Sequence, residues 1–407
     1  MDNAVMAPGR ERWLLVTLAG IQLTHTLDFM IMMPLGPQLT ALFGITPAAF
    51  GLLVSAYTLA AGCSSLLASF FIDRFGRKHV LMVLYSGFAL ATLACAYAPS
   101  YAWLMLARVA AGMFGGVLFT LAQLIIAEVV PFERRGRAMG VLMSAFSLTT
   151  VAGVPVSLWL ASAWQWHAPF VMLAGLSAAL LLVAAVQLPA LDGHLAAQGP
   201  PPGAKAVAKR WWQVLQAPNH RRAFAFTALN VGVGFTVIPY ITIYLQSNVG
   251  VRTEQLPWMY LIGGVVTFFT SRQLGRWADA RGKRWVYERL AALTALPLMA
   301  LTTLPEVPFA VVVGVSTVFF VVVSGRLVPV MALVSAAAVP ALRGTFMALN
   351  GAVQSLAMGL ATFVVGYLIH TNAMGQVQGY WINGLVGSVV ALAAIGVGRR
   401  MQHMESS

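Results

Sequence analysis

The sequence predicts an all-α membrane protein whose twelve transmembrane helices form two pseudo-symmetric six-helix bundles. Three observations predict this fold: charged residues are scarce, apolar runs recur at the length of a bilayer crossing, and short motifs of the first half return in the second half. Helices are expected rather than barrel strands, because the runs are about 20 residues long and uniformly apolar.

The composition of the 407-residue chain excludes a soluble protein. Hydrophobic residues make up 59% of it and charged residues 9%, whereas ordinary soluble domains are about 25% charged. So few charges cannot cover a surface of this size, which excludes a cytosolic enzyme, a secreted disulfide domain and a disordered chain. Cys63 and Cys95 lie inside apolar runs and are expected to be small core residues.

Twelve apolar runs have the length that a helix needs to cross a bilayer. The first follows Arg10 and Arg12 and is not followed by a small-residue cleavage site, so we expect an uncleaved first helix rather than a signal peptide. The predicted spans are residues 13–35, 48–72, 79–98, 102–127, 138–160, 169–189, 223–245, 256–275, 286–304, 308–332, 344–369 and 380–398.

The longest polar segment separates the first six spans from the last six. It contains three consecutive prolines between Gly199 and Gly203, which stop helix continuation. Basic residues and the pair Trp211–Trp212 follow, a pattern typical of an amphipathic segment at the membrane surface. We expect an N-terminal bundle at residues 1–189, a cytoplasmic linker at 190–222 and a C-terminal bundle at 223–407.

The positions of the 25 basic residues predict the orientation in the membrane. If the N-terminus is cytoplasmic, the outer loops contain only Arg252, and Arg108 and Arg326 lie deep within spans. Nearly all the other basic residues then fall on the cytoplasmic side, as the positive-inside rule requires. We therefore expect a multi-pass protein of the cell inner (plasma) membrane with both termini in the cytoplasm.

Three short motifs occur in both halves at a nearly constant shift. After span two, residues 73–78 read D-R-F-G-R-K, and after span eight, residues 279–284 read D-A-R-G-K-R. An Arg-Gly pair precedes both span five and span eleven, and Pro34 and Pro239 are expected to end spans one and seven. Three coincidences at a shift of about 206 residues indicate two parallel repeats.

The first of these loops resembles the signature loop of the major facilitator superfamily, G-x-L-A-D-R-x-G-R-K. Residues 69–78 read S-F-F-I-D-R-F-G-R-K, so Ser69 stands at the first glycine, and the second half has that glycine as Gly275. With the twelve spans and the repeat, the resemblance covers essentially the whole chain. It implies transport of a small molecule by alternating access between the two bundles.

In that family the loop acts as a latch that closes the cytoplasmic side, against the start of span eleven, when the protein opens outward. Gly76 is expected to permit a sharp turn and Asp73 to face the positive end of a neighbouring helix. The alternative is a turn that only follows the positive-inside rule. The expected latch residues are Asp73, Arg74, Gly76, Arg77, Lys78, Asp279 and Gly282.

Two further stretches resemble the drug-efflux branch of the family, whose members exchange drugs for protons. They are L-D-F-M-I-M-M-P at residues 27–34 and the R-x-x-x-G element at Arg108 to Gly112. Span five keeps only Gly153 and Pro155 of the antiporter signature G-x-x-x-G-P-x-x-G-G. The pattern is therefore more similar to the sugar-and-drug efflux permeases that resemble arabinose exporters.

Asp28, Arg108 and His25 are the candidates for proton coupling. Asp28 is the one acidic residue deep in a span, where a charge is costly unless it is paired or hydrated, so a functional role is its default interpretation. His25 precedes it by one helical turn and lies on the same face. Arg108 lies at a comparable depth in span four, which makes an interaction with Asp28 possible. The alternatives are structural pairing for Asp28, a structural tie between helices for Arg108 and a hydrogen-bonded cavity residue for His25.

Polar and adaptable side chains in the spans are the candidates for substrate binding. Arg326 either attracts an anionic substrate or holds a cytoplasmic gate, and a structural role is the alternative. Methionine repacks around varied ligands, although helix packing or lipid contact explains such residues equally well. The candidates are Phe29, Met33, Tyr57, Gln123, Asn230, Tyr240, Arg326, Asn350 and Gln354.

The favoured function is a secondary active transporter that exports small amphipathic compounds by proton antiport. The alternatives are a proton-coupled uptake symporter or uniporter for a sugar or organic acid, and, from another class, a membrane sensor that transports nothing. The sequence contains no phosphate loop, metal-ligand spacing or nucleophile triad, so no enzyme activity, cofactor or metal is expected. The expected partners are a small-molecule substrate, protons and the lipid bilayer, with no nucleic acid, and a monomer is expected.

The latch hypothesis makes the first testable prediction. Asp73→Asn removes a charge that faces a helix terminus, so we expect a folded protein whose outward-open state is less populated. The accessibility of single cysteines placed on the two sides of the membrane measures this shift. Unchanged accessibility together with full transport reduces Asp73 to a residue that only helps set topology.

Overall fold

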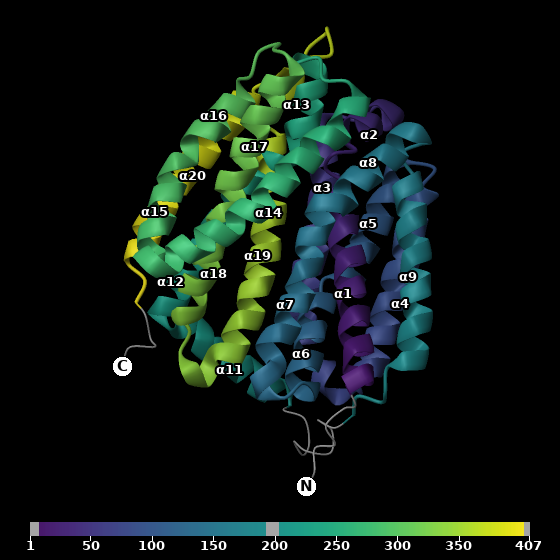
Figure 1. Cartoon of the computed structure of the whole chain (residues 1–407), viewed down its shortest axis with the longest axis vertical. Coiled ribbons are helices and arrows are strands. Elements are labelled where there is room, and N and C mark those ends of the chain that lie inside the picture. Colours follow the sequence, from purple (N-terminus) through teal and green to yellow (C-terminus); the bar gives the residue numbers. More distant parts are fainter. Residues whose placement is uncertain (1–7, 193–202, 403–407) are drawn as a thin grey trace.

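The computed structural model describes residues 8–192 and 203–402, except for the side chains of Pro8, Asp73, Phe132 and Glu133. Its long helices run side by side along the longest axis of the molecule, and α1 begins and α20 ends toward the same end of that axis (Figure 1). We call this the terminal end, and the opposite end, which carries two short strands, the hairpin end. The first-half helices α4, α5 and α9 and the second-half helices α15, α16 and α20 lie on opposite sides of the view in Figure 1.

In the described residues, the regular elements of the first half are all helices. Its elements are α1 (Pro8–Ile31), α2 (Gly36–Phe43), α3 (Pro47–Ala68), the 3-10 turn η1 (Ile72–Arg74), α4 (Arg77–Ala96), α5 (Tyr101–Gly115), α6 (Leu118–Val129), α7 (Phe132–Leu148), the π-helical turn η2 (Thr149–Gly153), α8 (Val154–Ala163) and α9 (Ala168–Gln187).

The second half repeats this order after one additional helix, α11. Its elements are α11 (Ala204–Gln216), α12 (Pro218–Phe235), η3 (Ile238–Tyr240), α13 (Ile241–Asn248), η4 (Thr253–Gln255), α14 (Leu256–Arg281), α15 (Lys283–Leu293), α16 (Ala295–Thr302), α17 (Phe309–Gly325), α18 (Leu327–Ala336), η5 (Pro340–Leu342), α19 (Arg343–Gly366) and α20 (Tyr380–Arg399), with strands β1 (His370–Thr371) and β2 (Val377–Gln378) before α20. The strands pair antiparallel, with His370 opposite Gln378.

All twelve predicted spans coincide with helices, which confirms the all-α membrane fold. Within the described residues, ten helical segments are long and apolar enough to cross a bilayer. The other two predicted spans fall on α14, which is 26 residues long, and on α15 with α16. Several spans are interrupted, a feature that the apolar runs did not reveal.

The interruptions have local chemical causes. Span one ends at Ile31, just before Pro34, as predicted, and after a turn the short helix α2 follows. The prediction for Pro239 was wrong: this residue lies in the 3-10 turn η3, and span seven continues through α13 to Asn248. In span five, the π-helical turn η2 comes directly before Pro155, whose ring nitrogen cannot donate the helical hydrogen bond. These breaks let the backbone change direction inside the membrane.

Helices α3 and α19 form the closest contact between the two halves. A side chain at Gly62 would overlap Leu356 of α19, and one at Gly359 would overlap Thr58 and Leu59 of α3. The Ser55 hydroxyl donates to the Gly359 carbonyl oxygen at 2.9 Å. Small residues on both helices therefore allow a close backbone approach, as is usual between helices in a membrane.

The linker helix α11 packs onto the terminal end. Val214 is fully buried, and Trp211 contacts Phe70 of the first half with a ring-centroid distance of 4.8 Å. Trp212 is 61% exposed on another face, and Lys205 and nearby basic residues are exposed too. The placement fits the amphipathic surface segment that the sequence predicted.

The two halves share one capping interaction at the same position of the repeat. The Lys78 ammonium donates to two carbonyl oxygens at the end of α9, at 2.8 and 2.5 Å. Arg284, about 206 residues later, donates to two carbonyl oxygens at the end of α20, at 3.0 and 2.9 Å. Each cation thus satisfies carbonyl groups at the negative end of a helix. The parallel repeat is therefore visible in side-chain contacts as well as in element order.

This pair of contacts predicts equal effects of two distant substitutions. Lys78→Met and Arg284→Met each remove a cation from a helix C-terminus, so each should lower the free energy of unfolding by about 1 kcal/mol. Lys283→Met is the control, because Lys283 is exposed and forms no hydrogen bond with a described residue. Unfolding in mild detergent measures all three. A loss at one position alone contradicts the equivalence of the two contacts.

Candidate functional site

A buried ion pair joins span one to span four. Arg108 Nη1 donates to Asp28 Oδ2 at 2.7 Å, and both side chains have zero exposure. The Thr92 hydroxyl of α4 donates to the other carboxylate oxygen at 3.2 Å. A buried charge is tolerated when it is paired and hydrogen-bonded, and Asp28 has both kinds of partner.

Glycine brings the helices of this site together. A side chain at Gly112 of α5 would collide with the backbone of Tyr57 in α3, so only glycine permits this approach. The result places the Tyr57 ring against the guanidinium of Arg108, at 4.4 Å from its carbon to the ring centroid. This cation–π contact adds to the stabilisation that the ion pair with Asp28 gives the guanidinium.

Several polar atoms around the pair have hydrogen-bonding capacity that no described protein group fills. They are Arg108 Nε and Nη2, the Tyr57 hydroxyl and His25 Nδ1, all buried. Buried polar groups are normally satisfied, so a cluster of unfilled ones on neighbouring residues is unusual. The cluster extends the site from the ion pair toward His25.

His25 lies near the ion pair but is separated from it. Its ring contacts Tyr57 and Phe88, with centroid distances of 6.3 and 6.1 Å, and no hydrogen bond joins it to Asp28 among the described residues. The one-turn spacing on the helix therefore does not make a His–Asp contact. Tyr57 connects the two, because it contacts both His25 and Arg108.

A second buried arginine lies in the other half. Arg326 has zero exposure and occupies the break between α17 and α18. Its Nη2 donates to the Asn230 carbonyl oxygen at 2.8 Å and its Nε to the Val323 carbonyl oxygen at 3.4 Å, whereas Nη1 finds no partner in the part of the chain that the structure describes. No ion pair joins it to any residue in the described ranges.

The other predicted substrate residues divide into two groups. Phe29 stacks between Tyr57 and Phe235 of the second half, at centroid distances of 5.5 and 5.9 Å. Met33 and Tyr240 are tightly packed near the hairpin end, where Tyr240 donates to the Thr362 carbonyl oxygen at 2.9 Å. These last two are engaged with protein in this conformation.

The three predicted amides other than Asn230 differ in exposure. Asn350 is buried and accepts a hydrogen bond from Thr227 at 2.7 Å. Gln123 is half-buried, and Gln354 of α19 is exposed although it lies within a span. An exposed amide at this depth fits a position facing water better than one facing lipid.

The hairpin end closes the two halves onto each other. The Thr242 hydroxyl donates to the Met33 carbonyl oxygen at 3.1 Å, and the Tyr240 hydroxyl lies between Gly51 and Gly366. A side chain at Gly36 would press on Ile243 across the same boundary. Spans one, two, seven and eleven therefore meet closely at this end.

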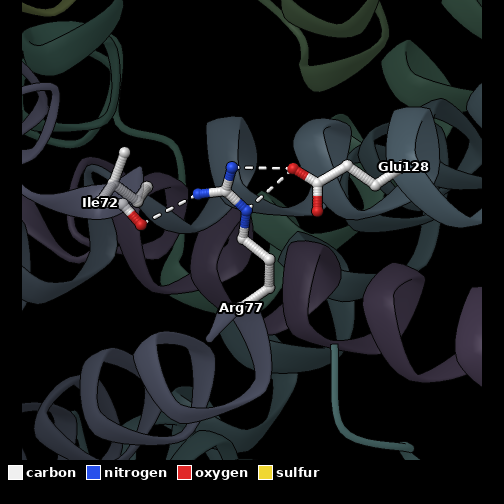
Figure 2. Close-up of polar contacts among 3 residues, drawn as sticks. All are labelled: Ile72, Arg77 and Glu128. Carbon is white, nitrogen blue, oxygen red and sulfur yellow. Dashed lines mark hydrogen bonds and ion pairs between the residues drawn. The ribbon is translucent and has the colours of Figure 1, made fainter. Parts of the chain in front are cut away.

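The predicted latch loop is anchored within the first half. Figure 2 shows Arg77, which is 2% exposed: its Nε and Nη2 donate to Glu128 Oε1 at 3.0 and 2.7 Å, and its Nη1 donates to the Ile72 carbonyl oxygen at 2.9 Å. Glu128 at the end of α6 was not predicted, because its distance along the sequence conceals the contact. The side chain of Asp73 lies outside the described part of the chain, and Arg74 is exposed.

The glycines of the two loops differ in backbone conformation, and the predicted need for glycine at a sharp turn is not found at Gly76. Gly76 has φ −58°, which any residue adopts, so it is not needed for a sharp turn. A side chain there would meet the carboxylate of the exposed Asp192, which would have to move. Gly282 has φ +93° and does require glycine. Asp279 is exposed and forms no ion pair within the described ranges, so the second loop lacks the buried anchor of the first.

The side chains of this site offer a carboxylate that can exchange a proton and guanidinium, phenol and amide groups that can form hydrogen bonds. Among the described residues, no group of three or more histidine, cysteine or acidic side chains is placed to hold a metal ion.

Twelve membrane-crossing spans in two repeated halves, with ionisable residues buried between helices, define the class of secondary transporters. A family model described as the Major Facilitator Superfamily matches residues 18–362. The chain belongs to this superfamily, whose members are transporters.

Individual relatives and solved structures are similar to this chain to different extents. "Inner membrane transport protein YdhP" of Escherichia coli (strain K12) is 30% identical over 201 residues, which cover 49% of each chain. The "Gallate transporter" of Pseudomonas putida is 32% identical over 211 residues, 51% of this chain and 46% of the relative. Each alignment thus spans about half of the relative. The E. coli xylose transporter XylE, in a partially occluded inward open conformation, superimposes with a TM-score of 0.76 at 16% identity, over 98% of this chain and 99% of that chain.

The ion pair predicts a non-additive stability pattern. Asp28→Leu or Arg108→Leu alone leaves an unpaired buried charge and should cost about 3–5 kcal/mol. The double substitution should recover most of this loss, because no charge then remains buried. Thermal unfolding of the purified variants gives the coupling. Additive losses in the double variant contradict a direct pair.

Proposed function

We propose that this chain exports small amphipathic compounds in exchange for protons, by alternating access between its two halves. The observation that carries the proposal is the Asp28–Arg108 pair, a titratable carboxylate buried at zero exposure beside polar groups with unfilled hydrogen-bonding capacity. Ionisable residues at such depth are costly and mark ion pathways and relays in membrane proteins. The resemblance of spans one and four to the drug-efflux branch supports export as the direction of transport.

The coupling step follows from electrostatics. When Asp28 is ionised, it holds Arg108 through the 2.7 Å hydrogen bond. A proton on Asp28 removes that attraction and releases the guanidinium, whose Nε and Nη2 already have free capacity. Protonation therefore changes how spans one and four are held together. A substrate that favours the ionised pair would displace the proton, which is the exchange that antiport requires.

Alternating access needs one side to close while the other opens. The contacts of Tyr240 and Thr242 hold the two halves together at the hairpin end. By the positive-inside rule, we assign the terminal end to the cytoplasmic side of the cell inner (plasma) membrane, with both termini in the cytoplasm. With that orientation, we assign this conformation to a state closed toward the outside. The glycines at the boundary permit this closure because they allow direct contact.

Uptake of an organic acid is the second candidate. It is favoured by the similarity to the gallate transporter, which covers about half of each chain. Direction of transport separates the two candidates. Cells that express an exporter accumulate less of a transported dye, and the effect disappears when the proton gradient is collapsed, whereas gradient-driven accumulation identifies uptake.

Proton coupling predicts a specific loss in one variant. Asp28→Asn mimics the protonated state but cannot cycle, so it should still bind an uncharged substrate while gradient-driven transport falls to background. In weakly buffered detergent solution, substrate should release protons from the wild type and none from Asp28→Asn.

The control is Thr92→Val, which removes one hydrogen bond to Asp28 and keeps the carboxylate. It should retain proton release. Equal release from wild type and Asp28→Asn, with uphill transport intact in the variant, moves coupling away from Asp28, and His25→Gln then tests the next residue.

A further inference from the structure

We propose that Arg326, with Tyr287 as a second donor, forms a binding site for the carboxylate of an amphipathic monocarboxylic acid. The inference deepens the proposed function, on which it rests, by naming the chemical class of the substrate and placing its charged end in the second half. It starts from a contrast between the two fully buried arginines of this chain.

The contrast concerns charge compensation. Arg108 has Asp28 at 2.7 Å and the face of Tyr57 at 4.4 Å. Arg326 is equally buried, yet in the described ranges its partners are two carbonyl oxygens, and its Nη1 donates to nothing. A buried charge without a counter-charge is unfavourable, and such groups in membrane spans usually serve a ligand.

A second donor lies in the same region. The Tyr287 hydroxyl is buried and forms no hydrogen bond of normal length with a residue in the described ranges. A series of contacts connects it to Arg326: the Asn230 carbonyl oxygen accepts from Arg326, Asn230 Nδ2 donates to the Phe226 carbonyl oxygen at 2.8 Å, and the Phe226 ring contacts the Tyr287 ring. Three residues from α12, α15 and the α17–α18 break thus converge, with donors on Arg326 and Tyr287. A carboxylate accepts hydrogen bonds only, so it matches the two donors.

The charge and the neighbours restrict the ligand further. One guanidinium compensates one negative charge, so a monovalent carboxylate leaves the buried site neutral, whereas a divalent phosphate would leave a buried negative charge. The surroundings are apolar: Phe226 meets the Tyr287 ring edge-on at a centroid distance of 4.9 Å, and Leu274 packs against Gly325. An acid with an apolar body fits such a site better than a sugar acid, which carries many hydroxyl groups.

The position of Arg326 separates substrate charge from proton coupling. Asp28 and Arg108 lie in the first half, and Arg326 lies in the second. The anion is therefore recognised by one bundle while the proton is handled by the other. Because the site is fully buried in this conformation, the acid enters in a state in which the helices around Arg326 separate.

The test is binding to the full-length protein in detergent, without a proton gradient. Benzoate, phenylacetate and hexanoate are each compared with the corresponding neutral amide. At least one carboxylate should raise the Tm of the wild type by about 2 °C or more, and its amide should not. Arg326→Leu should abolish that shift while its own Tm stays at or above the wild-type value, because it removes an uncompensated charge.

Two further variants complete the experiment. Tyr287→Phe keeps the ring and its contact with Phe226, so it should weaken carboxylate binding without lowering Tm, and it serves if Arg326→Leu does not fold. Arg276→Leu removes an exposed positive charge of the same half and should leave the carboxylate shift intact.

Three outcomes overturn the proposal: no carboxylate stabilises the wild type more than its amide, the shift persists in Arg326→Leu, or it persists unchanged in Tyr287→Phe. Each leaves proton antiport untouched, because that is measured by substrate-induced proton release at Asp28. Conversely, carboxylate binding that depends on Arg326 without proton release contradicts the antiport mechanism alone.

Discussion

The central constraint on this protein is the cost of a charge inside the membrane. Asp28 and Arg108 are both fully buried, so each is stable only while the other remains within hydrogen-bonding distance. Much of the first half serves this contact. Gly112 lets α5 approach α3, Tyr57 covers the guanidinium, and Thr92 donates to the second carboxylate oxygen. A proton added to the Asp28 carboxylate would therefore affect contacts with both α4 and α5.

The two halves repeat in architecture but differ in chemistry. Lys78 and Arg284 cap equivalent helices at the terminal end, and each half has a broken first span. The buried charges do not repeat: the first half has a compensated pair, and the second has Arg326 with carbonyl partners. The repeat supplies two halves of similar architecture, and the buried charges distinguish one half from the other.

Glycine sets the contacts at the boundary between the halves. Gly62 and Gly359 allow α3 and α19 to touch along their length, and Gly51 and Gly366 accommodate the Tyr240 hydroxyl at the hairpin end. Gly51, Gly62 and Gly359 each face a larger side chain of the other half, such as Leu356 or Tyr240, so the two halves pack directly against each other. A boundary of this kind suits a protein whose proposed cycle alternates between two closed ends.

The sequence by itself determined the fold. Hydropathy over about 20 residues decides which segments can span a bilayer as helices, and the spacing of motifs along the chain indicates the repeat. The sequence also identified Asp28 and Arg326 as exceptional, since any charge deep in a span is. It did not determine partners: Glu128 for Arg77, Asp192 beside Gly76, and the separation of His25 from Asp28 depend on how distant helices pack. The same applies to the breaks at η2 and Arg326, which arise inside runs of uniform hydropathy. Only the tertiary structure decided which buried charge is compensated, because compensation is a matter of a few ångströms between helices that the sequence leaves unspecified.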